Sequence, residues 1–380
     1  MKTALIHGQP SWEFSSDTVN AAITQLGGHL APVTFRCGAK EFSPFSVAPW
    51  AEEKIEADTP SILKALRGDF FCSPFGADEK PYRGESHQPH GETANANWHF
   101  ESLKRSDAGV DLHLSLETKV RAGHVDKFLS LKNGETAIYS RHVLSGMKGN
   151  MTLGHHATLK FPEENGSGHI STSRMAGGWT FPGDFEEPAR GGYNSLKTSS
   201  TFKRLDRVPL AQGGYTDLSR YPARRGFEDI VQIVHQDSPD FAWTAAAFPK
   251  EGYVWFSLKD PRVLQSTVFW ISNGGRHYAP WNGRHVNVMG LEDVTSYFFL
   301  GISPAEKPNP ISSEGFKTFT KFDPKKPTIV NYIMAVAAIP RDFERVKKII
   351  PDAHGVTLVS PTGHRVPVKL DLTFLYKNSL

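Results

Sequence analysis

Residues 111–117, Asp111-Leu112-His113-Leu114-Ser115-Leu116-Glu117, alternate a leucine with a polar residue along their whole length. Successive side chains of a β-strand point to opposite faces, so this alternation predicts a strand with one buried and one solvated face. Such strands are typical of antiparallel sheets. Further along, apolar residues 128–131 and 137–139 flank Asn133-Gly134, a pair that supplies the positive φ angles of a tight turn. The stretch therefore predicts antiparallel strands joined by hairpins.

The same strand signal recurs on both sides of this stretch. Upstream, residues 19–24 lead through Gly27-Gly28 into residues 29–35, which predicts a strand, a turn and a second strand. Downstream, further apolar segments bounded by turn residues are predicted as strands: 230–235, 241–247, 253–258, 266–271, 330–338, 356–359 and 366–374. Together these segments predict an all-β fold, a large antiparallel β-sandwich with few short helices.

Helix signals are few. The clearest covers residues 340–350, where a proline begins the segment, acidic residues come early and Lys347 and Lys348 come late, as the helix dipole favours. A second, short helix is predicted within residues 52–66.

Residues 165–222 are rich in glycine, serine and arginine and show weak periodicity, yet aromatic residues recur through them. We therefore expect long loops and short strands that cover one face of the sandwich, rather than a linker between domains. With no other candidate linker, residues 1–380 are predicted to form a single domain, because large all-β folds often reach this length as one unit.

Composition excludes several classes of protein. Hydrophobic residues make up 39% of the 380 residues and charged residues 22%, so a sizeable core can form. The 43 basic and 40 acidic residues are interspersed, which predicts no nucleic-acid partner. Cys37 and Cys72 form no C-x-x-C pair, which argues against a disulfide framework or a cysteine-rich zinc site. Without a signal-peptide pattern or a run of 18 apolar residues, we expect a cytoplasmic protein with no membrane partner.

Three distant segments carry residues suited to proton transfer. The first is residues 66–98, LRGDFFCSPFGADEKPYRGESHQPHGETANANW; the second contains His155 and His156, and the third contains Glu292. An acid and a base must approach a substrate from different directions, so they commonly come from separate parts of a chain.

In their order and coarse spacing, these motifs resemble those of the galactose mutarotase-like superfamily, the aldose 1-epimerases and hexose-phosphate 1-epimerases. Residues 66–76 are similar to the segment R-G-G…C-x-P-x-F-G, and residues 89–91 to the H-G motif with a tryptophan behind it. Residues 156–159 resemble the strand with the second histidine, and residues 290–292 the G-x-E segment with the catalytic carboxylate. The resemblance implies the sandwich fold, a small-molecule sugar as partner, and neither cofactor nor metal.

The resemblance also implies a mechanism in which two protons move as a pyranose ring opens and recloses. Glu292 would take the proton of the anomeric hydroxyl, and His156 would deliver a proton to the ring oxygen. His90 would hydrogen-bond the same oxygen. Residues 92–94, Glu-Thr-Ala, replace the aromatic residue and arginine that follow H-G in the sugar-phosphate branch.

Substrate-binding residues follow from the same resemblance. Arg67 would bind a sugar hydroxyl or a more distant anionic group. Trp98 and Trp281 are candidates to stack on the apolar face of a sugar, or they are core residues. His155 competes with His156 for the position that faces the substrate, because neighbours on a strand point to opposite sides.

Other interpretations remain open at this point. A zinc site could combine His87, His90 and His155, and a cation could bind Glu292 and Asp293, although neither spacing is that of a standard site. The protein could instead be a non-catalytic carbohydrate-binding protein on the same sandwich. It could also be a lyase or a hydrolase, which would need a second carboxylate such as Glu92 or Asp293. The sequence specifies neither the sugar nor the oligomeric state.

Overall fold

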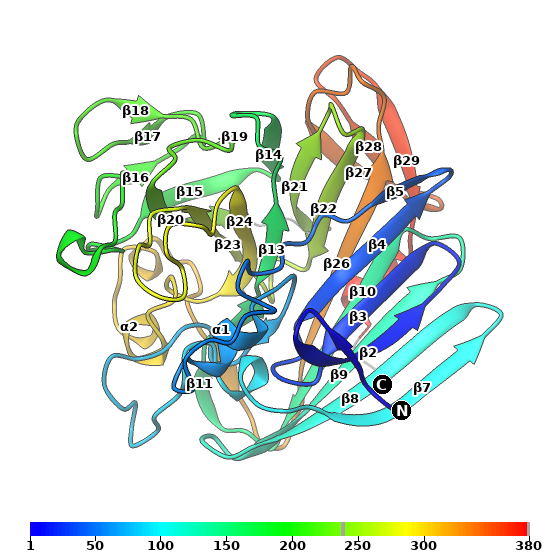
Figure 1. Ribbon diagram of the computed structural model, residues 1–380, viewed down its shortest axis with the longest axis horizontal. Coiled ribbons are helices and arrows are strands. Elements are labelled where there is room, and N and C mark those ends of the chain that lie inside the picture. Colours follow the sequence, from blue (N-terminus) through cyan, green and yellow to red (C-terminus); the bar gives the residue numbers. More distant parts are fainter. Residues whose placement is uncertain (237–239, 378–380) are drawn as a thin grey trace.

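Antiparallel strands are the main elements of the structure, a computed structural model that describes residues 1–236 and 240–377. The largest sheet has nine strands, and its middle strand is β26 (Figure 1). In spatial order the strands are β19 (Arg220–Tyr221), β14 (Gly168–Thr172), β21 (Ala242–Phe248), β22 (Tyr253–Lys259), β26 (Thr328–Ala338), β10 (Ala137–Ser145), β9 (Gly123–Lys132), β8 (Gly109–Thr118) and β7 (His99–Ser106).

Two further sheets pack against the nine-stranded sheet. One has eight strands: β16 (Thr201–Phe202), β15 (Met175–Thr180), β20 (Phe227–His235), β23 (Ser266–Asn273), β24 (Val288–Thr295), β12 (Leu153–His155) and β6 (Phe71–Cys72), with β13 (Ala157–Lys160) paired to β24. The other has five: β1 (Ala4–Ile6), β2 (Gln9–Ser15), β3 (Val19–Thr24), β4 (Leu30–Cys37) and β5 (Lys40–Phe42). Apolar side chains from all three sheets form one buried cluster, which is the core of the sandwich.

Smaller elements cover the edges and outer faces. They are two two-stranded sheets, β11 (Gly149–Met151) with β25 (Thr320–Phe322) and β17 (Val208–Pro209) with β18 (Tyr215–Thr216), and a three-stranded sheet of β27 (Lys348–Asp352), β28 (Gly355–Val359) and β29 (Arg365–Lys369). The short helices are α1 (Ser61–Ala65), α2 (Ile302–Glu306), η1 (Glu92–Ala94), η2 (Pro188–Arg190), η3 (Ser312–Glu314) and η4 (Leu372–Tyr376). No helix in the described ranges is long and apolar enough to cross a membrane.

The predicted antiparallel sandwich is confirmed. Residues 111–117 lie in β8, and Gly134 has the positive φ, 74°, that a turn between β9 and β10 requires. The short helix predicted within residues 52–66 is α1. Residues 165–222 hold loops and short strands as expected, but they also supply two strands to each of the two large sheets, β14 and β19 to one and β15 and β16 to the other. The single-domain assignment of residues 1–380 stays a prediction.

The helix predicted over residues 340–350 is wrong. Its second half enters strand β27, and Lys347 N donates to Val359 O at 2.7 Å as the strand pairing begins. Phe343, Val346 and Ile349 are buried with residues of β21, β22 and β26 on the outer face of the nine-stranded sheet. Tertiary burial of these apolar residues therefore overrides local signals of charge and proline placement.

A buried ion pair joins the two large sheets. Lys259 at the end of β22 and Asp293 on β24 are fully buried, with Nζ and Oδ1 2.5 Å apart. Asp293 also accepts hydrogen bonds from the hydroxyls of Ser257, Thr267 and Tyr332. Every polar atom of the carboxylate is thus paired, which is the condition for a buried charge to be tolerated.

Lys259→Met should destabilise the protein by about 3–5 kcal/mol, because it leaves the Asp293 carboxylate buried without its cation. Adding Asp293→Asn to this variant should recover much of the lost free energy of unfolding, since an amide keeps a hydrogen-bond acceptor without the charge. The measurement is urea-induced unfolding. Lys250→Met is the control, because its pair with Glu164 is exposed and should contribute less than about 1 kcal/mol. Equal losses for the two single variants would contradict the assignment.

Candidate active site

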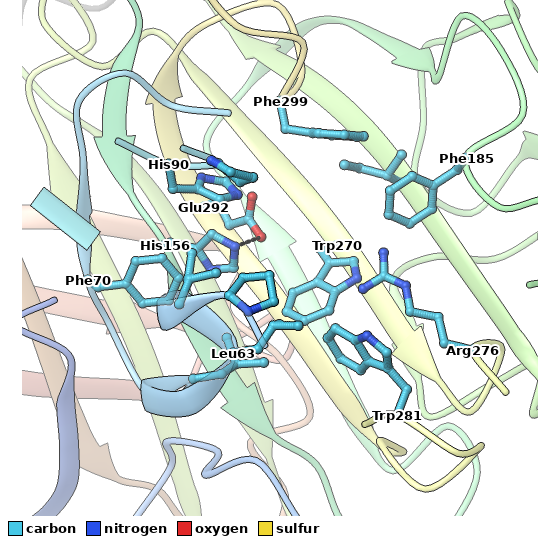
Figure 2. Close-up of a pocket in the computed structure, with 15 residues that line it drawn as sticks. Leu63, Phe70, His90, His156, Phe185, Trp270, Arg276, Trp281, Glu292 and Phe299 are labelled. Carbon is cyan, nitrogen blue, oxygen red and sulfur yellow. Dashed lines mark ion pairs between the residues drawn. The ribbon is translucent and has the colours of Figure 1, made fainter. Parts of the chain in front are cut away.

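A pocket of about 220 Å³ opens on the outer face of the eight-stranded sheet (Figure 2). Its lining is mainly apolar and aromatic, with only a few polar side chains, as is typical of small-molecule sites. The apolar residues are Pro60, Ile62, Leu63, Leu66, Phe70, Pro89, Phe185, Ile230, Trp270, Trp281 and Phe299, and the polar residues are His90, His156, Arg276 and Glu292. Loops and α1 form the walls, and β20, β23 and β24 form the floor.

Glu292 reaches the pocket because side chains alternate along β24. Its neighbour Asp293 points between the sheets to Lys259, so Glu292 points to the opposite face. The carboxylate of Glu292 lies over Gly290, where an added Cβ would be 2.3 Å from Oε1. A glycine two residues before the carboxylate therefore leaves the space that the carboxylate occupies.

His156 lies at the break between β12 and β13, directly beside the pocket. Its N–H donates to Phe70 O at 2.9 Å, and its ring stacks on the Phe70 ring with centroids 4.3 Å apart. Its Nδ1 is 3.2 Å from the Thr158 hydroxyl oxygen, and that hydroxyl donates to the main-chain oxygen of His156. The Thr158 oxygen must then accept a hydrogen bond from Nδ1–H, which leaves Nε2 of the neutral ring as an acceptor.

His90 is placed by a tight loop. It has φ of 66°, and the following Gly91 has φ of 72° with no room for a Cβ, which would be 2.1 Å from Ser73 O. The N–H of Gly76 donates to His90 Nδ1 at 3.3 Å, so the neutral ring carries its proton on Nε2. The ring centroids of His90 and His156 are 5.1 Å apart. One histidine of the pair is therefore a donor and the other an acceptor.

Glu292 and His156 are in close contact in the pocket. Nε2 of His156 is 3.1 Å from Oε1 of Glu292, and Figure 2 shows the two groups facing each other. Oε1 makes no well-aligned hydrogen bond among the described residues. Both contacting atoms carry lone pairs, and these lone pairs repel each other unless one of the two groups is protonated. Burial raises the pKa of Glu292 well above its usual value and lowers the pKa of His156 well below 6.5. Both shifts favour the neutral pair, in which the proton is on Glu292.

His90 is also neutral in the folded protein. Burial lowers its pKa to about 4. The site thus combines a protonated carboxyl, an imidazole that accepts and an imidazole that donates, which is a set suited to moving two protons without a net charge.

Among the predicted site residues, the structure brings His90, His156, Glu292 and Trp281 to one pocket and leaves out three others. Arg67 is a correction: it is 1% exposed and lies outside the pocket, where its guanidinium donates to the main-chain oxygens of Ile6, His7 and Ala65. Arg67 thus connects residues 6 and 7 near the chain start with Ala65 at the end of α1, so its role is structural.

Trp98 and His155 are the other two corrections. Trp98 is fully buried in the sandwich core, and its indole N–H donates to Thr93 O. His155 points between the sheets, where its Nδ1 is 2.8 Å from Asp69 and its ring stacks on Tyr332. Strand alternation sends His155 to the face opposite to His156.

No group of three or more potential metal ligands occurs in the described part of the chain. The three histidines considered for zinc do not converge, since His87 bonds to Glu85 and His155 lies in the core. Glu292 and Asp293 cannot bind one cation together, because they face opposite sides of β24.

Sequence reasoning missed the polar residue at the other end of the pocket, Arg276. It follows Asn273-Gly274-Gly275, which reads as an ordinary turn. Phe185 and Trp270, which line the pocket beside it, were also missed. Only the recurrence of aromatic residues in 165–222 pointed toward this wall.

Solved structures with a similar architecture include several proteins that are named as aldose 1-epimerases or as mutarotase-like proteins. A galactose mutarotase-like protein from Clostridium acetobutylicum is 10% identical, with a TM-score of 0.57, covering 89% of this chain and 98% of its own. A provisionally named aldose 1-epimerase from Escherichia coli K12 is 13% identical, with a TM-score of 0.56, covering 87% and 100%. A galactose mutarotase related enzyme from Lactobacillus acidophilus is 12% identical, with a TM-score of 0.54, covering 87% and 98%.

The chain therefore has the galactose mutarotase-like fold, at a sequence distance that marks it as divergent. No model of a known protein family matches the sequence, and no curated protein sequence matches it. At these identities the similarity concerns the fold alone, so the activity has to be argued from the pocket.

Glu292→Gln should stabilise the protein relative to the wild type by an amount that grows with pH. The folded pKa of Glu292 is raised, so above pH ~4.3 the unfolded chain releases a proton that the folded protein keeps. Wild-type stability should then fall by up to about 1.4 kcal/mol per pH unit from this residue, a loss that glutamine avoids.

The measurement is the free energy of unfolding in urea at pH 5 and pH 8 for both proteins. The control is Glu187→Gln, because Glu187 is exposed. The free energy of unfolding of this variant should differ from that of wild type by the same amount at both pH values. A pH-independent difference for Glu292→Gln would show that Glu292 is ionised in the folded state.

Proposed function

We propose that the protein is an isomerase that interconverts the anomers of an aldose by opening and reclosing the sugar ring. The observation that carries this proposal is the contact between His156 Nε2 and Glu292 Oε1 in a pocket floored by tryptophan. The galactose mutarotase-like fold supports it, since structures that share this fold are named as mutarotases or aldose 1-epimerases.

The protonation of the site favours roles opposite to those expected from the sequence. His156 Nε2 accepts the proton of the anomeric hydroxyl, and Glu292 delivers its own proton to the ring oxygen. As the bond from the anomeric carbon to the ring oxygen breaks, the anomeric oxygen becomes a carbonyl oxygen. His90 Nε2–H donates a hydrogen bond to the oxygen on which negative charge develops.

The transient state is an imidazolium beside a carboxylate. These opposite charges lie within hydrogen-bond distance in a water-poor pocket, so each stabilises the other. Rotation of the open-chain aldehyde and reclosure return both protons to their starting groups. The reaction therefore balances without an oxidant or a further reactant.

The pocket gives less support to the alternatives. A hydrolase needs a second carboxylate near the first. Asp293 faces the core, and Glu92 accepts hydrogen bonds from the main-chain N–H groups of Lys119 and Val120, away from the pocket. A binding-only protein has no need for a buried carboxyl held against a neutral imidazole, which destabilises the fold as pH rises. The cytoplasmic location stays a prediction.

Glu292→Gln should lower kcat by ~10²–10⁴-fold with little change in KM, because the amide cannot release a proton to the ring oxygen. Wild-type kcat should decline on the alkaline side as Glu292 ionises and on the acidic side as His156 becomes protonated. The assay is polarimetry or proton NMR of anomer exchange for a panel of freshly dissolved aldoses, with Glu187→Gln as the control. Wild-type turnover by Glu292→Gln would exclude this role.

Gly290→Ala tests whether the position of the carboxyl matters apart from its chemistry. The new methyl would lie 2.3 Å from Oε1 of Glu292, so the carboxyl must move away from His156. Anomer exchange should slow by ~10-fold or more, while the protein remains folded by circular dichroism. Gly183→Ala is the matched control, since a Cβ there meets nothing within 4 Å. Unchanged exchange in Gly290→Ala would contradict the proposed geometry.

A further inference from the structure

The end of the pocket away from His156 is formed by an arginine that is held in place by a carboxylate. Arg276 Nε donates to Oε1 of Glu186 at 2.5 Å, and the Tyr278 hydroxyl donates to Oε2 at 3.1 Å. Gly192 makes room for this carboxylate, because an added Cβ would be 2.4 Å from Oε2. Glu186 is 8% exposed and belongs to the 165–222 segment, so this segment reaches the site.

Aromatic rings surround the guanidinium on the pocket side. The Cζ atom of Arg276 is 4.5 Å from the ring centroid of Trp281, 5.2 Å from Phe185 and 5.6 Å from Trp270. Figure 2 shows the guanidinium directed among these rings at the edge of the pocket. The hydrogen bond to Glu186 uses only Nε, so the two terminal nitrogens are available to donate to a ligand.

The charge of Arg276 is already balanced by carboxylates. Besides Glu186, the buried Glu228 lies beneath Trp270 and accepts hydrogen bonds from Trp270 Nε1 at 3.2 Å and Ser272 Oγ at 2.8 Å. Burial raises the pKa of Glu228 to about 7, so it is partly ionised at neutral pH. Around this end of the pocket, the guanidinium of Arg276 thus faces the carboxyl groups of Glu186 and Glu228.

We propose that Arg276 is a specificity-determining residue that donates hydrogen bonds to the hydroxyls of an uncharged sugar. Glu186 sets the preference for an uncharged sugar by neutralising the charge of Arg276. A phosphate or carboxylate on the sugar would be brought beside Glu186 and Glu228 with only one guanidinium to compensate, which is unfavourable in a water-poor pocket. A hydroxyl needs only the donor. The inference rests on the proposed function, because it concerns the sugar in the same pocket.

Glu186→Gln tests the inference, since glutamine keeps the hydrogen-bond acceptor and the size but removes the charge. Binding of glucose, glucuronate, glucose 6-phosphate and inorganic phosphate is followed by calorimetry and by tryptophan fluorescence. Wild type should bind glucose more tightly than its two anionic counterparts and should not bind phosphate. Glu186→Gln should bind glucuronate and glucose 6-phosphate ~10-fold more tightly or better than wild type does and should bind phosphate measurably, with glucose affinity changed less than about 3-fold.

Controls separate charge from disruption. Glu187→Gln should behave as wild type, and Arg276→Met in the Glu186→Gln background should abolish the gain for anions. Thermal unfolding of each variant verifies that it is folded, and Arg276→Met alone should weaken glucose binding without favouring anions. Should Glu186→Gln unfold, two results still test the inference. They are the preference of wild type for glucose over the anions and the loss of glucose binding in Arg276→Met.

Two failures are distinguishable. Tighter binding of glucuronate or glucose 6-phosphate than of glucose by wild type, with anomer exchange intact, overturns this inference and leaves the proposed function standing. Absence of binding and of anomer exchange for every aldose in the panel overturns the proposed function, and the inference falls with it.

Discussion

The buried ion pair between Lys259 and Asp293 links the two large sheets through the core of the sandwich. It crosses from β22 to β24 in the middle of the core, where neither charge has access to water. Because side chains alternate along a strand, an Asp293 that faces the core requires Glu292 to face the pocket. A shift of β24 by one residue would turn Asp293 toward the pocket and away from Lys259 and its hydroxyl partners. The register that stabilises the sandwich is therefore the register that builds the site.

Two adjacent carboxylates consequently have opposite protonation. Burial disfavours the charged form of both, but Lys259 and several hydroxyls outweigh it for Asp293, whose pKa is lowered. Glu292 contacts a neutral imidazole and apolar walls, and its pKa is raised. Environment alone thus shifts the pKa values of these two neighbouring carboxyl groups in opposite directions. Gly290 and Gly91 contribute space rather than contacts, since the positions of Glu292 and His90 depend on the absence of a Cβ.

The two ends of the pocket are formed by different parts of the fold. The sandwich is similar to those of mutarotase-like proteins at 10–13% identity. The acid–base end of the pocket comes from the central strands and the loop around His90, which the motif order marks. The opposite end comes from residues 165–222 and the loop after β23, which bring Phe185, Glu186 and Arg276 together. Loops on a rigid sandwich set what binds, while the sandwich positions the chemistry.

The all-β antiparallel fold could be predicted from the residue pattern, and so could three residues at the centre of the site, His90, His156 and Glu292. Both predictions depend on short-range information, namely the period of two along strands and motifs that combine a polar residue with the glycine that accommodates it. Long-range contacts were needed to show that residues 340–350 form no helix, that Arg67 holds the chain start and that Arg276 reaches the pocket. These outcomes depend on contacts between segments far apart in the chain, and burial and pairing there outweigh local preference.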